Sequence, residues 1–478
     1  MTDFLDGPVF RMGITPGVTV GTTYGEGVYP QTATITIPRQ RAELKNKYPI
    51  PFLAGHHPTP AGVMRGVDDV GSVLAFDSSI TGRYIQTEDY NPGLTGDTVS
   101  TYWNDGNIFG DTSLRYNHQA RVTNLTVLGN AQLHPYPWAT NGPIPDPYGP
   151  DFVRIADGLC MQGSGHQARH LRFYGIPGAC LIMKNGTGSQ GGVFSPIEDG
   201  GINPSNLASW IFMSTAMYGL STARGTDTKL DHIYGGGFVH DGIIGGNNTI
   251  LTNAHIAGAD RALVAAYPIH CSDIYMEASR IGVHLTGSYT DPETGGTVTG
   301  TGAFKSSIDD LQIGPGSNWY RSVLCSGYGS GSSITGVTGY VRAEDATYPD
   351  IAAIEIEDGT NDCTIKESIE HLGIGKSLIL AGNRHTAQVN TYWGGAWAGK
   401  IVECRHPLYQ SDVAIRGQIG GGWALDLLNS SQATVNGLGT VFDIKVVLNG
   451  SAAAVRYPAG KTAADLAGTK IYINGVLQ

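Results

Sequence analysis

The chain has 478 residues, of which 15% are charged, and its 30 Lys and Arg face 41 Asp and Glu, a formal net charge of −11. This length exceeds the size at which one globular core keeps growing, so several domains or a linear repeat are expected. The sequence has no basic run and its net charge repels phosphate, which excludes nucleic acid as a partner. No apolar run approaches the roughly 18 residues of a membrane-spanning helix, so membrane insertion is not expected.

The N-terminal stretch Met1 to Phe10 is acidic and lacks the cationic and apolar regions of a secretory signal. The cysteines are scattered without a CxxC pair, and several lie inside apolar triplets. We therefore expect free core thiols in a reducing compartment, and neither a metal site nor a cofactor. The six cysteines are Cys160, Cys180, Cys271, Cys325, Cys363 and Cys404.

The first part of the chain, residues 1–115, lacks the repeating pattern found in the rest of the sequence. It contains a Gly- and Thr-rich stretch over 12–27 and one strand-like alternation over 32–38. We predict that 1–115 caps the fold or attaches the protein to a larger particle, since the exposed end of a repeat must be covered. The regular part begins near His118, where HQARVTNLTVLG is echoed at His166 by HQARHLRFYG.

From there one short pattern recurs: a small or charged residue, an alternating apolar triplet, and a turn rich in Gly and Asn. A second short strand-like segment lies between successive copies. Units of roughly 20 to 50 residues that hold strands and tight turns predict a solenoid whose neighbouring units cover each other. The copies start at Gly178, Asp241, Arg261, Arg280, Arg321, Ala353, Lys376, Lys400 and Trp423, and the intervening segments at Leu230, Thr252, Ser272, Asp309, Thr335, Glu367, Val389, Val413 and Thr434.

The repeat predicts strands and not helices, because the apolar residues alternate over four to seven positions and 68 Gly and 24 Pro would break helices. The two-strand rhythm argues against a β-propeller, which needs four strands per blade. We predict an all-β, parallel β-helix over 116–435. The rhythm fades after Gln432, and 436–478 is predicted to be a C-terminal β cap or trimerisation segment.

The paired strands after Arg121, Ala168, Asp231 and Asp350 resemble those of the pectate-lyase-like, right-handed parallel β-helix proteins, and among them the spikes of tailed phages and phage-derived particles. The resemblance covers about residues 118–435 and implies a homotrimer that is attached to other virion proteins through its N-terminal segment. It also implies assembly in the host cytoplasm and localisation to the virion. Tail and head attachment both remain open.

Rungs of a β-helix lie about 4.8 Å apart, so carboxylates on neighbouring rungs can reach the separations of glycosidase acid and base pairs. Polar residues at strand edges also form solvated ladders without any catalytic role, and both interpretations stay open. A column of Asp241, Arg261, Arg280 and Arg321 before the triplets is interpreted as a salt ladder, which contributes little stability where it is exposed. The candidate catalytic residues are Asp231, Asp241, Asp273, Glu277, Glu355 and Glu357.

Aromatic and histidine side chains are the candidates for holding a sugar ring, because their amphipathic rings favour interfaces. These candidates are Trp319, Tyr320, Tyr392, Trp393, Trp397, His232 and His255. The expected function is a spike that binds a host surface polysaccharide. Two alternatives are an endo-acting polysaccharide hydrolase or lyase, and a non-enzymatic head decoration.

Overall fold

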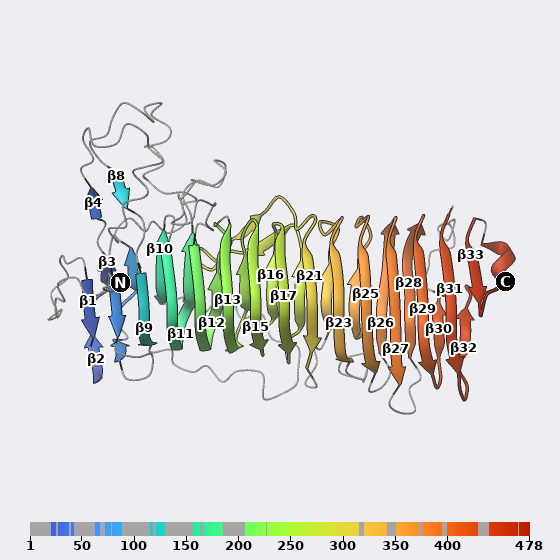
Figure 1. Cartoon of the computed structure of the whole chain (residues 1–478), viewed down its shortest axis with the longest axis horizontal. Coiled ribbons are helices and arrows are strands. Elements are labelled where there is room, and N and C mark those ends of the chain that lie inside the picture. The colour runs from blue at the N-terminus through green and yellow to red at the C-terminus, as the bar shows by residue number, and fades with distance from the viewer. Residues whose placement is uncertain are drawn as a thin grey trace, which may run out of the picture. The chain divides into compact units, whose positions relative to one another are not determined.

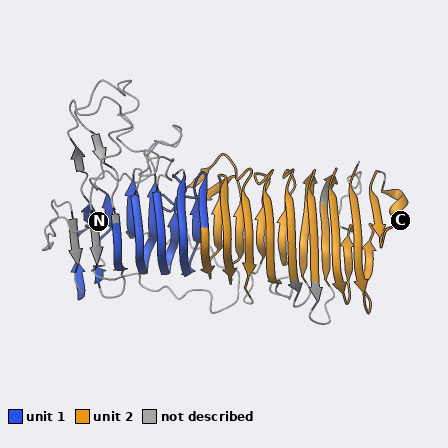
Figure 2. Ribbon diagram, in the orientation of Figure 1, with its two compact units in different colours: residues 1–139, 144–251, 290–296 blue, residues 140–143, 252–289, 297–478 orange. Residues whose placement is uncertain are grey.

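A computed structural model describes residues 21–24, 27–37, 40–42, 63–66, 72–77, 79–87, 115–117, 121–129, 156–162, 166–184, 206–225, 227–314, 320–341, 350–371, 375–393, 399–428, 439–466 and 468–478. Its contacts divide the chain into two compact units (Figure 2): unit 1 holds 1–139, 144–251 and 290–296, and unit 2 holds 140–143, 252–289 and 297–478. The described residues form strands and one 3-10 helix, an all-β architecture.

The elements in chain order are β1 (Gly21–Tyr24), β2 (Gly27–Gln31), β3 (Ile35–Ile37), β4 (Gln40–Ala42), β5 (Val63–Gly66), β6 (Ser72–Phe76), β7 (Gly82–Thr87), β8 (Arg115–Asn117), β9 (Arg121–Leu128), β10 (Ala156–Gln162), β11 (His166–Lys184), β12 (Asn206–Ser221), β13 (Thr228–Phe238), β14 (Asp241–Gly245), β15 (Thr249–Ala257), β16 (Arg261–Ala265), β17 (Ile269–Glu277), β18 (Ile281–Leu285), β19 (Ser288–Thr290), β20 (Thr297–Thr299), β21 (Ser307–Ile313), β22 (Arg321–Cys325), β23 (Ser333–Val341), β24 (Ala352–Ile356), β25 (Thr364–His371), β26 (Lys376–Asn383), β27 (Thr386–Trp393), β28 (Lys400–Tyr409), β29 (Asp412–Ile419), β30 (Trp423–Asp426), β31 (Val441–Leu448), β32 (Ala453–Arg456), the 3-10 helix η4 (Ala463–Asp465), β33 (Lys470–Ile473) and β34 (Val476–Leu477). Thirty of the strands belong to one sheet, and β4 with β8 and β19 with β20 form two separate pairs (Figure 1).

In unit 1, strands β9, β11, β12 and β13 pair in parallel and in register. Leu125, Leu171, Ile211 and Ile233 occupy one position of the four strands, and all four are fully buried. The alternate positions face outward, as the period-two geometry of a strand requires. Two strands nearer the N-terminus, β5 and β6, also pair in parallel with β9.

Each of these four strands is bent by one residue with a left-handed backbone. The bend falls at one register position, just before the buried position of Leu125, and is occupied by Asn124, His170, Trp210 and His232, whose φ angles lie between 51° and 57°. Asn tolerates this conformation because its short side chain bonds locally, whereas a bulky side chain rarely adopts it. We call this position the corner.

Unit 2 contains two sets of parallel strands. One set runs β17, β21, β23, β25, β27, β29, β31 and β33, and the other β16, β18, β22, β24, β26, β28, β30 and β32. Successive strands of the chain alternate between the two sets, so each turn of chain adds one rung to both. An inward column of Val337, Val389, Ile415 and Ile444 is interrupted only by Glu367.

Buried side chains at the strand starts of unit 2 satisfy backbone N–H groups of the preceding rung. The Ser306 hydroxyl accepts from Ile269 N (3.1 Å), His385 Nδ1 accepts from Cys363 N (3.2 Å), and the Ser411 hydroxyl accepts from His385 N (3.0 Å). A buried N–H without a partner would cost free energy, so these contacts stabilise the stacking of rungs.

The predicted strands are confirmed wherever the structure describes them. All nine apolar triplets fall on strands, and so do eight of the nine intervening segments; the ninth, at Thr434, lies outside the described residues. The six cysteines are free and buried, as expected. In the described part of the chain, no helix has the length and apolarity needed to cross a membrane. The domain boundaries at 115 and 435 stay predictions.

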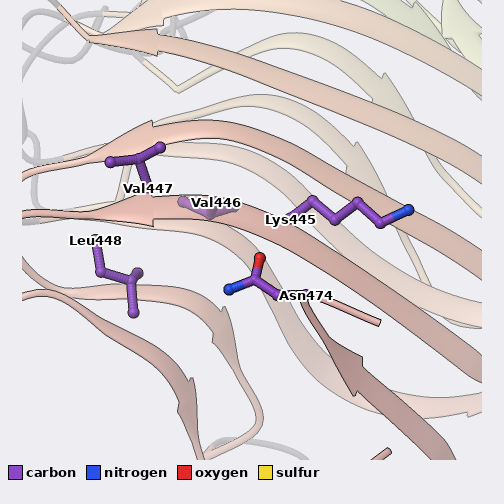
Figure 3. A pocket seen from close by; sticks show the side chains of 5 residues that line it. All are labelled: Lys445, Val446, Val447, Leu448 and Asn474. Carbon is purple, nitrogen blue, oxygen red and sulfur yellow. The ribbon is translucent and has the colours of Figure 1, made fainter. Parts of the chain in front are cut away.

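Among the strands that the structure describes, the C-terminal half of β31 has a partner on one side only. Strand β29 pairs with all of β31, whereas β33 pairs with Val441–Ile444 alone. Beside the unpaired half lies a hollow of about 570 Å³ (Figure 3), lined by Lys445, Val446, Val447, Leu448 and Asn474. Val447 and Leu448 are exposed, as are Val476 and Leu477 of β34.

Candidate functional site

The outer surface of β11, β12 and β13 in unit 1 carries a group of aromatic and histidine side chains. His170, Trp210 and His232 occupy the corner of three successive rungs. Two positions further along each strand, Arg172, Phe212 and Tyr234 face outward from the same rungs. We call the set His170, Tyr174, Trp210, Phe212, His232 and Tyr234 the aromatic strip.

Trp210 lies at the centre of the strip. Its ring stacks on His232 with centroids 3.9 Å apart and planes at 20°, and it lies nearly parallel to His170 at 6.0 Å. The side chain is still 48% exposed. Its φ of 56° costs about 1–2 kcal/mol for a bulky residue, a cost that the Asn124 of the same column avoids. A strained backbone that presents an exposed indole is the kind of outlier that points to a binding role.

Polar groups border the rings on both sides. The Asp231 carboxylate lies 3.0 Å from His232 Nδ1, and the centroid of the Tyr234 ring lies 6.4 Å from that of His232. The Arg172 guanidinium lies 5.7 Å from the centroid of the exposed Phe212 ring. Flat apolar faces beside hydroxyl, carboxylate and guanidinium groups suit a ligand that is apolar on one face and rich in hydroxyl groups at its edge.

Among the predicted catalytic residues, Glu277 is partly exposed and lies beside two polar side chains. The Tyr275 hydroxyl donates to Glu277 Oε2 (2.9 Å), and His255 Nε2 lies 3.6 Å from Oε1. A side chain at Gly314 on the next rung would collide with both Tyr275 and Glu277. The structure thus brings two of the candidate residues, His255 and Glu277, together and adds Tyr275. Burial and the contact with Glu277 raise the pKa of Tyr275.

Asp231 and Asp241, both predicted as catalytic, lie in different environments. Asp231 is half-buried at the aromatic strip, whereas Asp241 is fully buried with its carboxylate 2.9 Å from His240 Nδ1. Asp273 is exposed, and its φ of 55° gives it a bend like those at the corner of unit 1. A carboxylate that solvent does not reach is poorly placed to meet a polymer, so of the two Asp231 has the better position.

Glu355 belongs to a network of ion pairs in unit 2. Arg321, fully buried, binds Glu355 through Nε and Asp350 through a terminal nitrogen (2.9 Å). Asp350 also accepts from Lys376 (2.8 Å) and from Arg405. The network continues through Glu403 and Lys400 to Asp426. We call these residues the charged ladder: Arg321, Asp350, Glu355, Lys376, Lys400, Glu403, Arg405 and Asp426.

The ladder follows the strand register. Arg321, Lys376 and Lys400 occupy one position of the sheet, and Glu355, Glu403 and Asp426 occupy the third position after it. Although burial opposes ionisation, the hydrogen bonds from Arg405 and Lys376 hold the pKa of Asp350 far below its ordinary value, and Lys400 and Arg405 lower that of Glu403 in the same way. Such permanently ionised, ion-paired carboxylates are unsuited to proton transfer.

The remaining candidates are placed as follows. Glu357 lies half-buried after the end of β24, two positions from Glu355. Tyr320 is half-buried beneath the Arg321 guanidinium, which lies 3.8 Å from its ring centroid. Tyr392 and Trp393 lie in β27, where their side chains are outside the described set, and Trp319 and Trp397 lie outside the described residues altogether.

Of the aromatic strip, only His232 was predicted. Its partner Trp210 lies 22 residues earlier and is brought beside it by the parallel register of β12 and β13. The repeat of HQAR at His118 and His166 indicates where the regular strands begin. The corner has no such sequence pattern, because Asn, His and Trp all occupy it. In the described part of the chain, no group of three or more His, Cys, Asp or Glu side chains is arranged to hold a metal ion.

No protein-family model matches the chain, and no curated protein matches its sequence. Solved structures do match. The pre-mature gene product 12 of bacteriophage phi29 is similar with a TM-score of 0.52 at 11% identity, over 92% of this chain and 53% of that one. An N-terminal fragment of the same phi29 protein gives 0.54 at 12% identity, over 92% and 67%.

A tailspike protein of the E. coli bacteriophage HK620 is also similar, with a TM-score of 0.48 at 11% identity, over 93% of this chain and 73% of that one. The chain spans about half the length of the pre-mature phi29 protein. At these identities the likeness shows the fold alone. At that level the phi29 matches agree with the resemblance to phage proteins that the sequence indicated.

Proposed function

We propose that the protein is a virion spike of a phage or phage-like particle, built as a right-handed parallel β-helix, that binds a host surface polysaccharide through the aromatic strip. The observation that carries this proposal is Trp210, an exposed indole held in a left-handed backbone and stacked on His232. The phage proteins of similar fold support the assignment to a virion. Attachment through residues 1–115 and a homotrimer held by 436–478 belong to the same proposal.

The test uses the substitution Trp210→Asn, because Asn124 already occupies the corner and fits its backbone. The purified protein is applied to an array of bacterial surface polysaccharides. Wild type is expected to retain a subset of them, and Trp210→Asn to weaken each by about tenfold, the contribution of one aromatic contact. Tyr328→Asn, which removes an exposed ring outside the strip, serves as the control and should bind as wild type does. Retention that does not depend on Trp210 would refute the proposal.

A second candidate function is cleavage of the bound polysaccharide. The observation in its favour is Glu277, a solvent-accessible carboxylate held by the Tyr275 hydroxyl and close to His255. Polysaccharides retained on the array are incubated with the protein and assayed for new reducing ends, and for the ultraviolet absorbance of the unsaturated product that a lyase releases. Products that wild type releases and Glu277→Gln does not release would establish an enzyme. If wild type releases no product, the protein binds the polysaccharide without cleaving it.

A further inference from the structure

The charge around the aromatic strip contrasts with that of the whole chain. The three rung segments 166–174, 206–214 and 228–236 contain Arg169, Arg172 and Lys229 but only one carboxylate, Asp231. That carboxylate lies beside His232. The chain as a whole has 41 acidic against 30 basic residues, so the excess of cations here is local.

The cations lie on both sides of the Trp210 rung. Arg169 is exposed on the rung of His170, and Lys229 is exposed on the rung of His232. Arg169 shares the register position of Ser209, and Lys229 that of Leu207. Two rungs of about 4.8 Å and two residues along the strand therefore separate the two backbone positions by about 12 Å, with the Trp210 rung between them. Arg172 is held against the Phe212 ring on the same surface. Arg169 lies one residue before the Trp210 position on one neighbouring rung, and Lys229 lies three residues before it on the other. A polymer that stacks on Trp210 and extends across the strands therefore meets a cation on each neighbouring rung.

We infer that the polysaccharide bound at the aromatic strip is anionic, with carboxylate, phosphate or sulfate groups on the sugars next to the one that stacks on Trp210. This inference rests on the proposed function and adds the chemical class of the ligand. Electrostatic attraction of this kind selects among ligands and weakens as salt increases. The remaining surface of an acidic protein repels the same polymer, which restricts binding to the strip.

The test compares dextran, carboxymethyl-dextran and dextran sulfate, three polymers with one glucan backbone and different charge. Wild type is expected to bind the two charged polymers about tenfold more tightly than dextran at low salt, and to lose this preference as salt rises. The double variant Arg169→Glu with Lys229→Glu should abolish the preference for the charged polymers over dextran. Lys366→Glu with Lys470→Glu, two exposed residues of unit 2, makes the same change in net charge and should preserve it.

The outcomes separate the inference from the proposed function. Equal binding of all three polymers that is lost in Trp210→Asn would overturn the anionic ligand and leave the binding strip intact. Tight binding of charged dextran that survives Arg169→Glu with Lys229→Glu would place the polymer elsewhere and also overturn it. Failure to bind either charged polymer would overturn the anionic ligand, whereas the polysaccharide array with Trp210→Asn decides the proposed function. A preference for the carboxymethyl or the sulfated polymer would identify which anion the strip favours.

Discussion

Glu367 is a single carboxyl group inside an apolar column. Val337 and Val389 occupy the same position on the neighbouring rungs, and all three are buried. Burial raises the pKa of Glu367 from its ordinary value of 4.5 to about 8, against a smaller opposing effect of the Ser377 hydroxyl. Between pH 4.5 and about pH 8 the Glu367 carboxyl group is protonated in the folded chain and ionised in the unfolded chain. Rising pH therefore lowers the free energy of unfolding by up to about 1.4 kcal/mol per pH unit.

The substitution Glu367→Val restores the column and removes this titration. We expect it to raise the melting temperature at pH 8 while changing it little at pH 4, where the carboxyl group is neutral in both states. Thermal unfolding of both proteins across that range measures the effect. Curves that run parallel over the whole range would show that Glu367 is not the group responsible.

At the scale of an element, the charged ladder tests how far buried ion pairs stabilise a stack of strands. Removing one partner of a buried pair leaves an uncompensated charge and costs about 3–5 kcal/mol. Arg321→Met should therefore lower the free energy of unfolding by that amount, since Glu355 would lose its buried cation. Arg384→Met breaks the exposed pair with Asp362 and should cost about 1 kcal/mol or less. Denaturant unfolding measures both, and equal costs would contradict this account.

The elements were predictable from the sequence because each strand carries its own alternation and each turn its own Gly and Asn. The side-chain partners were not, because they depend on register between rungs. Arg321 was interpreted as part of a salt ladder with Asp241, Arg261 and Arg280, yet its partners are Asp350 and Glu355 on the following rung. Partners one rung away lie some 30 residues along the chain, at distances that inserted loops make irregular.

The same reasoning explains which part of the site could be predicted. His232 and Asp231 are adjacent in the sequence, so their juxtaposition needed no knowledge of the fold. Trp210 joins them only once β12 is set beside β13 in register. Its left-handed backbone is a second property that sequence does not show, because Trp is among the residues least expected there. The aromatic residues that the sequence predicted as sugar-binding lie close together in the sequence, in the pairs Trp319–Tyr320 and Tyr392–Trp393 and at Trp397.

At the scale of the whole molecule, the proposed homotrimer makes a prediction about the C-terminal segment. Val447 and Leu448 of β31 and Val476 and Leu477 of β34 are exposed, beside the half of β31 that pairs with β29 alone among the described strands. Exposed apolar groups next to an unpaired strand edge favour association between chains. We therefore expect light scattering to give three times the chain mass of 50.5 kDa.

Charged substitutions in this segment should separate the chains without unfolding them. Val447→Asp with Leu477→Asp places carboxylates on side chains that make few contacts within one chain, so the expected result is a monomer with an unchanged circular dichroism spectrum. Val28→Asp, at an exposed valine of β2, is the matched control and should remain trimeric. If the double variant keeps the trimer mass, the contact between chains lies outside 436–478. Because the aromatic strip lies within a single chain, polysaccharide binding per site should survive dissociation, whereas avidity for a surface coated with the polymer should fall.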